Sequence, residues 1–354
     1  MQIHSNFTGG NIRLVSADEN TVTLENEYRD SPDGWFYWAF CIENAENRTI
    51  TFKLQKDRLG YFGPAVSHDL KNWTWLQNGT RSKDGDSFVY SFAPDESCVY
   101  FAHNMLYHPD RFFEFAKNLG LPTEELCKGY KGSSIPAVKF GSGEMSIVLT
   151  ARHHACESTG SYVLEGVLEE LYTKPIPNAR VFCVPFVDYE GVIRGDQGKD
   201  RTPHDHNRDY LPSGEPIYPE CIAIMDYVAK NKCHYAFDFH SPWHIGGRND
   251  KVFIVKNRVH NDIINGFSTV LEKNISAGAM KYSPADDIPF GSEWNVYSYN
   301  CSNFMSSRQE NNLAFSLETA YFGTEDNIIS AEKAIELGRC FARAIKEYVG
   351  CRGF

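Results

Sequence analysis

The sequence lacks a long apolar run. Its 354 residues contain no uninterrupted stretch of about 18 apolar residues, the length at which a helix crosses a membrane. The first residues, Met1 to Phe7, also lack the apolar segment of a secretory signal peptide. We therefore expect a soluble protein with no membrane partner.

Closely spaced cysteine pairs are absent as well. The chain has 10 cysteines, but they are scattered and none forms a C-x-x-C motif. Cys156 and Cys183 fall in segments that we expect to be buried. Buried free thiols in a reducing compartment are the interpretation that we favour, so we expect a cytoplasmic protein.

Positive charge is in deficit. The sequence has 35 Lys and Arg against 46 Asp and Glu, which gives a net charge of −11 and a pI near 5.6. Such a balance disfavours nucleic acid and anionic membranes as partners. The length exceeds what one hydrophobic core usually organises, which favours two domains.

The first 108 residues contain short alternating apolar segments and no helical periodicity. Asn, Asp, Gly and Pro separate these segments at a spacing typical of β-sandwiches. The expected strands are Ile12–Ser16, Thr21–Leu24, Trp35–Ile42, Thr49–Leu54, Ser87–Phe92 and Cys98–Ala102. We therefore predict an all-β sandwich domain over residues 1–108.

From Pro109 onwards, strand and helix patterns alternate. Helices are expected over about 109–119, 158–172, 218–231, 258–274 and 327–349, and strands over 145–150, 180–187, 233–240 and 314–318. This alternation indicates an α/β domain built on a mixed sheet over residues 109–354.

A His-x-x-Glu motif follows the first of these strands. His154 and Glu157 lie three residues apart on a turn that opens a helix, so an imidazole and a carboxylate can point at one cation. His240, at the end of another expected strand, is the best third ligand. The alternatives are His153, His206 and His244. Two histidines and one carboxylate leave a fourth position for water, which is the arrangement of catalytic zinc.

Further motifs recur in order along the chain. A Gly-Val-Ile-Arg-Gly loop at 191–195 precedes Asp205-x-Asn207-Arg208, and Glu318 lies in Ser-Leu-Glu-Thr. With the three candidate ligands, these motifs resemble those of the zinc metallocarboxypeptidases over nearly the whole chain. Within that family the chain looks most like the cytosolic carboxypeptidases, in which a β-sandwich precedes the catalytic domain. The resemblance implies a carboxypeptidase-like mixed β-sheet flanked by helices.

The resemblance also implies a catalytic centre. His154, Glu157 and His240 would bind one Zn²⁺ per chain and leave a water on the ion. Glu318 would take a proton from this water and later pass it to the leaving amine.

Three more residues receive roles from the same resemblance. Asp205 would accept a hydrogen bond from a zinc-ligand imidazole and hold its orientation. Asn207 and Arg208 would bind the terminal carboxylate of the substrate, since a guanidinium presents two parallel donors to a planar carboxylate.

The loop between the ligands departs from the family pattern. It begins Val187-Asp-Tyr-Glu-Gly191 where the family has Asn-Pro-Asp-Gly. The arginine with which the cytosolic branch polarises the substrate carbonyl falls on Gly198. We expect Arg201 to take this role; the alternatives are Arg194 or the absence of such a group.

Two features of substrate recognition stay open. The tyrosine that closes over the substrate in secreted relatives corresponds to Tyr297 or Tyr299. Arg308, ten residues before Glu318, could favour an acidic terminal residue, but we favour its interpretation as an exposed arginine on a turn.

The function implied by the resemblance is a zinc-dependent carboxypeptidase that hydrolyses the C-terminal peptide or isopeptide bond of peptide or protein tails. One alternative is an aspartoacylase-like zinc deacylase of N-acyl amino acids, which shares the His-x-x-Glu…His framework. Another is a binding module or pseudoenzyme. The sandwich before the catalytic half and the contiguous Asn207-Arg208 favour the first; retention of Glu318 argues against the last.

Overall fold

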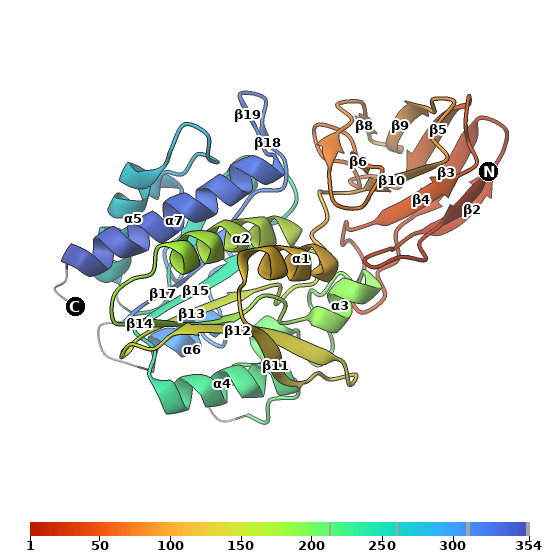
Figure 1. Ribbon diagram of the computed structural model, residues 1–354. Coiled ribbons are helices and arrows are strands. Elements are labelled where there is room, and N and C mark those ends of the chain that lie inside the picture. Colours follow the sequence, from red (N-terminus) through yellow and green to blue (C-terminus); the bar gives the residue numbers. More distant parts are fainter. Residues whose placement is uncertain (212–213, 260, 309–311, 352–354) are drawn as a thin grey trace.

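The computed structural model describes residues 1–211, 214–259, 261–308 and 312–351. A β-rich part, coloured red to orange in Figure 1, is followed by a larger part in which helices cover a central sheet. The expected α/β fold with a preceding β-sandwich is therefore confirmed. Among the described residues, no helix is long and apolar enough to cross a membrane.

Two five-stranded sheets form the N-terminal part, in the orders β1-β4-β10-β6-β7 and β2-β3-β5-β9-β8. Their strands are β1 (Gln2–His4), β2 (Arg13–Ala17), β3 (Thr21–Glu25), β4 (Ala39–Glu43), β5 (Thr49–Leu54), β6 (Ala65–Ser67), β7 (Thr74–Trp75), β8 (Thr80–Ser82), β9 (Gly85–Ser91) and β10 (Cys98–Ala102). Phe40, Phe52, Phe88 and Phe101 fill the space between them. Their alternation with outward-facing residues explains the period-2 pattern of the sequence.

Residues 35–38 differ from the expected strand, because β4 begins only at Ala39. Phe36 and Tyr37 pack in the core of the C-terminal part, whereas Trp38 belongs to the core of the sandwich. The segment thus joins two cores, and this tertiary packing outweighs the strand propensity of its aromatic residues.

A seven-stranded mixed sheet forms the centre of the second part, in the order β11-β12-β14-β13-β15-β17-β16. Its strands are β11 (Thr123–Lys128), β12 (Ser134–Gly141), β13 (Met145–Ala151), β14 (Ala179–Val184), β15 (Tyr235–His240), β16 (Phe253–Val255) and β17 (Leu313–Glu318). The four strands β14, β13, β15 and β17 are parallel. A small hairpin, β18 (Gly323–Thr324) and β19 (Asn327–Ile328), follows.

Helices cover both faces of this sheet (Figure 1). α2 (Ser158–Thr173), α5 (Asn261–Asn274) and α7 (Ala331–Cys351) share one hydrophobic core, which α1 (Pro109–Leu119) extends. α4 (Pro219–Asn231) and α6 (Cys301–Ser306) pack on the opposite face. The expected helix 258–274 begins at Asn261 in the structure, and residue 260 lies outside the described residues.

The carboxyl ends of β13, β15 and β17 lie side by side. Ala151 pairs with Phe239, and His240 pairs with Glu318. Parallel strands bring the residues that follow them to one edge of the sheet, where open α/β folds bind ligands.

Candidate functional site

Three candidate metal ligands meet at this edge. His154 and Glu157 lie on the turn between β13 and α2, and His240 is the last residue of β15. Nδ1 of His154 is 2.9 Å from one oxygen of Glu157, and Nδ1 of His240 is 2.8 Å from the other. All three side chains are buried, and their ligand atoms lie within 4.8 Å of one another. The structure therefore brings together the three residues chosen from the sequence.

The charges around Glu157 keep its carboxylate ionised, which is the form that binds a metal ion. Burial raises the pKa of Glu157, but the charges of His154, Lys199 and His240 outweigh it and hold that pKa well below its usual value. A buried carboxylate that stays ionised requires positive charge around it. Two imidazole nitrogens and a carboxylate that converge on one point form a donor set suited to zinc.

A carboxylate lies near the second ring nitrogen, Nε2, of each histidine in the cluster. Nε2 of His240 is 2.6 Å from Asp238, and Nε2 of His154 is 3.6 Å from Asp205. Asp238 was not foreseen, although it lies two residues before His240 on the same strand and therefore on the same face. Such outer carboxylates fix the ring orientation of metal-ligand histidines.

His153 belongs to this supporting layer rather than to the ligand set. Its Nδ1 lies 2.8 Å from Asp238, and its Nε2 lies 2.7 Å from the hydroxyl of Tyr210. His153, Asp238 and His240 could also hold a cation by distance alone. We favour a hydrogen-bond network, because both ring nitrogens of His153 are engaged and neither His153 nor Asp238 lines the cavity described next.

The other two alternative histidines lie elsewhere. His206 contacts Glu220 at 2.7 Å, and His244 contacts His103 at 3.1 Å. Neither belongs to a cluster with His154 and Glu157 among the residues that the structure describes.

A cavity of about 350 Å³ opens beside the cluster, and His154, His240 and Glu318 line it. Glu318, the last residue of β17, is buried, and its Oε2 atom has no hydrogen-bond partner among the residues that the structure describes. Burial, assisted by the nearby charge of Glu157, raises the pKa of Glu318 to about 7. A carboxyl group with such a pKa can accept and return a proton near neutral pH.

Asn207 and Arg208 line the same cavity as Glu318 and lie in a short 3₁₀ helix over His206–Arg208. The side-chain oxygen of Asn207 accepts a hydrogen bond from the Cys301 N–H at 3.0 Å, which fixes the amide. The Arg208 guanidinium lies 4.7 Å from the centre of the Tyr297 ring. Tyr297 is thus the one of the two candidate tyrosines that lines the cavity.

Arg201 is not placed in this cavity. Its guanidinium forms ion pairs with Asp30 and Asp188 and lies 2.9 Å from Nδ1 of His206, so it faces a neighbouring pocket. These partners already occupy its donors, and the geometry does not support the expectation that Arg201 polarises a carbonyl in the cavity.

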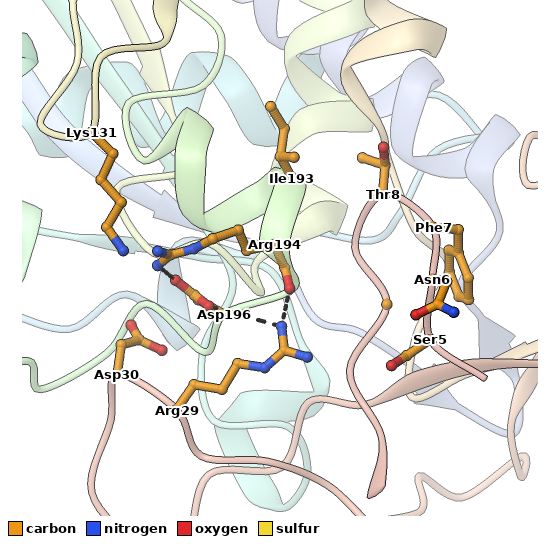
Figure 2. A pocket seen from close by; sticks show the side chains of 11 residues that line it. Ser5, Asn6, Phe7, Thr8, Arg29, Asp30, Lys131, Ile193, Arg194 and Asp196 are labelled. Atoms are coloured by element: carbon orange, nitrogen blue, oxygen red, sulfur yellow. Dashed lines mark hydrogen bonds and ion pairs between the residues drawn. The ribbon is translucent and has the colours of Figure 1, made fainter.

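The alternative, Arg194, is also remote. It lines a cavity of about 890 Å³ between the two parts of the chain, where it pairs with Asp196 (Figure 2). Arg29 donates a hydrogen bond to the Arg194 carbonyl in the same place. Arg308 is exposed, with its guanidinium 4.4 Å from the centre of the Phe304 ring, and it does not line the cavity beside the metal cluster.

A lysine reaches the cavity instead. The ammonium group of Lys199 contacts the Glu157 carboxylate, and its side chain is only 14% exposed. Sequence reasoning missed this residue. One feature of the sequence could have indicated it: Lys199 directly follows Gly198, the position that aligns with the carbonyl-polarising arginine of the cytosolic carboxypeptidases.

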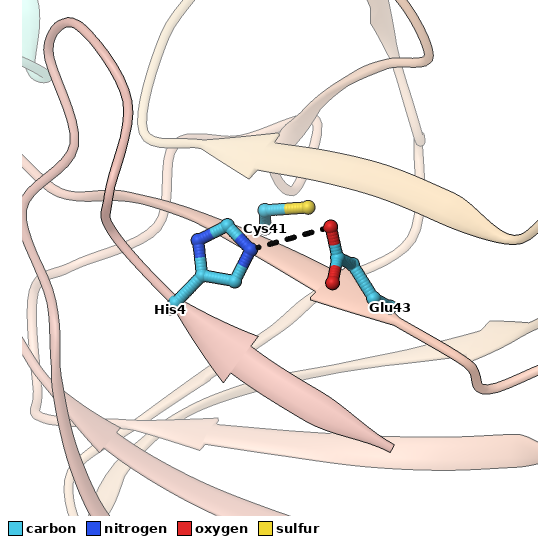
Figure 3. Close-up of side chains that lie close together, drawn as sticks. All are labelled: His4, Cys41 and Glu43. Atoms are coloured by element: carbon cyan, nitrogen blue, oxygen red, sulfur yellow. Dashed lines mark ion pairs between the residues drawn. The ribbon is translucent and has the colours of Figure 1, made fainter.

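A second group of potential ligands lies on the sandwich. Figure 3 shows His4, Cys41 and Glu43 on strands β1 and β4. His4 accepts a hydrogen bond on Nδ1 from the Asn6 N–H at 3.3 Å, and its Nε2 lies 3.5 Å from Glu43. Cys41 Sγ lies 3.0 Å from Cys98 Sγ, so each of the three side chains already has a polar neighbour within the sandwich. We favour a polar surface contact here.

Comparisons with known proteins agree with this arrangement. Residues 3–103 match the family model for the cytosolic carboxypeptidase N-terminal domain. Cytosolic carboxypeptidase 2 of Xenopus tropicalis is 27% identical over 274 residues, which cover 63% of this chain and 28% of that protein. Cytosolic carboxypeptidase 6 of Caenorhabditis elegans is 24% identical over 262 residues, which cover 62% of this chain and 56% of that protein. The chain thus spans only part of the length of these two relatives.

The fold has solved counterparts over its full length. The crystal structure of a metallo-carboxypeptidase from Burkholderia cenocepacia superimposes with a TM-score of 0.81 at 16% identity and covers 99% of both chains. The resemblance inferred from the motifs is therefore confirmed. Residues 3–103 match the cytosolic carboxypeptidase N-terminal domain, more than half of the chain is similar in sequence to cytosolic carboxypeptidases, and the whole chain shares its fold with a metallo-carboxypeptidase.

Proposed function

We propose that this protein is a zinc-dependent carboxypeptidase of the cytoplasm that removes the C-terminal residue from peptide or protein tails. One observation carries the proposal: two of the three candidate ligands, the buried Glu318 and an Asn-Arg pair line a single cavity. A carboxypeptidase needs metal ligands, an acid–base group and a carboxylate-binding group close enough to act on one substrate. Residues suited to all three roles line this cavity. We assign residues 109–354 to catalysis and residues 1–108 to the sandwich.

The terminal carboxylate of the substrate would bind Arg208 through two parallel hydrogen bonds, with Asn207 beside it. This fixes the last peptide bond near Glu318, because the three residues line the same cavity. His154, Glu157 and His240 would hold the zinc ion, while Asp205 and Asp238 keep the two imidazoles oriented.

A bound zinc ion would polarise the scissile carbonyl and acidify the attacking water. Glu318 would accept the proton of this water and then donate it to the amine that leaves. Its pKa of about 7 suits both steps, because the group is partly ionised at neutral pH and can be reprotonated without a large energetic cost.

The test is hydrolysis of matched peptides with a free or an amidated C-terminus, followed by mass spectrometry. We expect single residues to be released from the free acids only, a chelator to stop the reaction and added zinc to restore it. Equal cleavage of both peptide forms, or cleavage at internal bonds, would contradict exopeptidase activity. Hydrolysis of N-acetyl amino acids but not of peptides would establish the deacylase alternative instead.

A further inference from the structure

The N-terminal domain contacts the loop that carries Lys199. The Gln197 side chain donates to the Tyr37 carbonyl at 2.9 Å, and its oxygen accepts from the Tyr37 N–H at 2.9 Å. The Asp30 carboxylate accepts from the Gln197 N–H at 3.2 Å and from the Gly198 N–H at 3.1 Å. Residues 30–37 therefore fix the backbone of this loop through both side-chain and main-chain bonds.

Lys199 itself is held at its backbone and at its side chain, and its ammonium group forms an ion pair with the Glu157 carboxylate. Ser31 Oγ accepts a hydrogen bond from the Lys199 N–H at 3.2 Å and donates to the Lys199 carbonyl. The indole of Trp35 lies 5.4 Å from the Lys199 ammonium, within cation–π distance. Trp35 also packs against Trp243 on the cavity wall, with ring centres 5.4 Å apart.

The other side of the loop abuts the metal-binding turn. Gly198 has a φ of +77°, and a Cβ atom there would lie 2.2 Å from the backbone nitrogen of Ala155. The Cys156 N–H donates to the Gln197 carbonyl at 3.3 Å. The loop is thus enclosed between the sandwich domain and the turn that bears His154 and Glu157, so its position depends on both.

A largely enclosed ammonium group in this cavity has a definite chemical use. Hydrolysis of a peptide bond places negative charge on the carbonyl oxygen in the transition state, and a fixed cation in a site shielded from water stabilises that charge strongly. Lys199 lines the cavity together with Glu318 and Arg208. No described lysine or arginine other than Lys199 and Arg208 lines it, and Arg208 is assigned to the terminal carboxylate.

We infer that residues 30–37 of the N-terminal domain are part of the active site: they hold the loop over residues 196–199 so that Lys199 presents its ammonium group to the scissile carbonyl oxygen. Lys199 is a catalytic residue in this arrangement, and Ser31 and Trp35 are positioning residues. The inference rests on the proposed carboxypeptidase function. It also gives the sandwich domain a direct role in catalysis.

The first test compares Lys199→Met and Lys199→Arg with the parent enzyme and with Lys281→Met, which removes an exposed lysine paired with Asp326. Lys199→Met should lower kcat by about 100-fold or more, as loss of an oxyanion donor does, and change KM by less than about threefold. Lys199→Arg should restore at least about a tenth of kcat, because it keeps the positive charge.

Binding measurements separate this role from a structural one. In Lys199→Met, affinity for a peptide phosphonate that mimics the tetrahedral transition state should fall about as much as kcat, while affinity for the free amino acid product stays unchanged. Zinc content should match that of the parent. Loss of zinc, or retention of more than about a third of kcat, would overturn the assignment of Lys199.

The second test concerns the domain contact. Ser31→Ala and Trp35→Leu should each lower kcat about tenfold, without change in Tm or zinc content, since misplacing a catalytic group by a fraction of an ångström costs rate rather than fold. Ser16→Ala, on the exposed strand β2, is the matched control. Equal kcat in Ser31→Ala, Trp35→Leu and Ser16→Ala would refute a positioning role.

An inactive, zinc-loaded parent would refute the proposed function itself, whereas an active parent with an equally active Lys199→Met refutes only this inference.

Discussion

The two glutamates beside the cavity share positively charged neighbours but differ in their direct contacts with them. Burial raises the pKa of both, and the charges of His154, Lys199 and His240 lower the pKa of both. Glu157 contacts these three groups directly, so its pKa lies well below its usual value. No described residue forms a hydrogen bond with Oε2 of Glu318, and burial raises the pKa of this carboxyl group to about 7. One carboxylate thus stays charged and suits a metal, while the other can exchange protons. This separation of roles supports their assignment as ligand and general base.

At the residue scale, Arg208→Lys tests carboxylate binding. Lysine keeps the charge but loses the planar pair of donors, so we expect kcat/KM for free-acid peptides to fall at least about tenfold. The measurement is steady-state kinetics on free and amidated forms of one peptide. An unchanged kcat/KM for the free acid would show that another group binds the terminal carboxylate.

The residues of the metal cluster could be found from the sequence because their geometry is local. His154 and Glu157 share one turn, and His240 ends a strand whose alternation is plain. Lys199 could not be found in this way, because its direction depends on contacts with Asp30, Ser31 and Trp35, which lie more than 160 residues earlier in the chain.

At the element scale, α2 and α7 approach each other closely through glycine. A Cβ atom at Gly338 in α7 would lie 2.0 Å from the Val163 carbonyl oxygen of α2, and one at Gly166 would lie 1.9 Å from the Ile335 carbonyl oxygen. Glycine usually weakens a helix, so its presence at both contacts reflects the packing of the two helices.

We therefore expect Gly338→Ala to reduce the free energy of unfolding by about 2 kcal/mol or more, since the helices must separate. Gly350→Ala in the same helix is the matched control, because a Cβ atom there meets nothing within 4 Å. That change should stabilise the protein by up to about 1 kcal/mol. Urea unfolding measures both, and equal effects of the two substitutions would contradict the packing argument.

Elements with clear periodicity were predicted well, and elements that depend on capping or edges were not. Thr49–Leu54 was expected and is β5, and the strand expected at 145–150 is β13. α3 (Tyr189–Arg194) includes most of the Gly-Val-Ile-Arg-Gly segment that we described as a loop; Asp188 caps the start of this helix and Gly195 ends it with a φ of 72°. β11 was missed because its charged residues Glu124, Glu125 and Lys128 resemble those of a surface helix.

At the scale of the whole molecule, buried neutral histidines couple folding to pH. His108 lies where the two parts of the chain meet; burial, with a smaller contribution from Arg152, lowers its pKa to about 4. Burial likewise lowers the pKa of His244 to about 3. Above pH 6.5 both histidines are neutral in the folded and in the unfolded state, so their titration does not change the free energy of unfolding. Below that pH the unfolded chain binds protons at these histidines and the folded chain does not, so the free energy of unfolding decreases as the pH falls.

The free energy of unfolding should therefore decline between about pH 6.5 and 4, by roughly 1.4 kcal/mol per pH unit for each such histidine. His108→Gln removes one titrating group, and its stability should fall with pH less steeply than that of the parent by about this amount. Denaturant unfolding at a series of pH values measures the slopes. Identical slopes in parent and variant would mean that His108 is not kept neutral by the fold.

The central claim is that Glu318 provides acid–base catalysis beside a zinc ion held by other residues. Glu318→Gln keeps the shape of the side chain but removes the proton acceptor, so kcat should fall about 10³-fold or more. KM should change little, because Asn207 and Arg208 are intact. The deciding measurement is steady-state kinetics with metal analysis on parent and variant protein. We predict a large loss of kcat with about one zinc per chain in both proteins; a variant with full zinc and more than about a tenth of the parent's kcat would contradict the account.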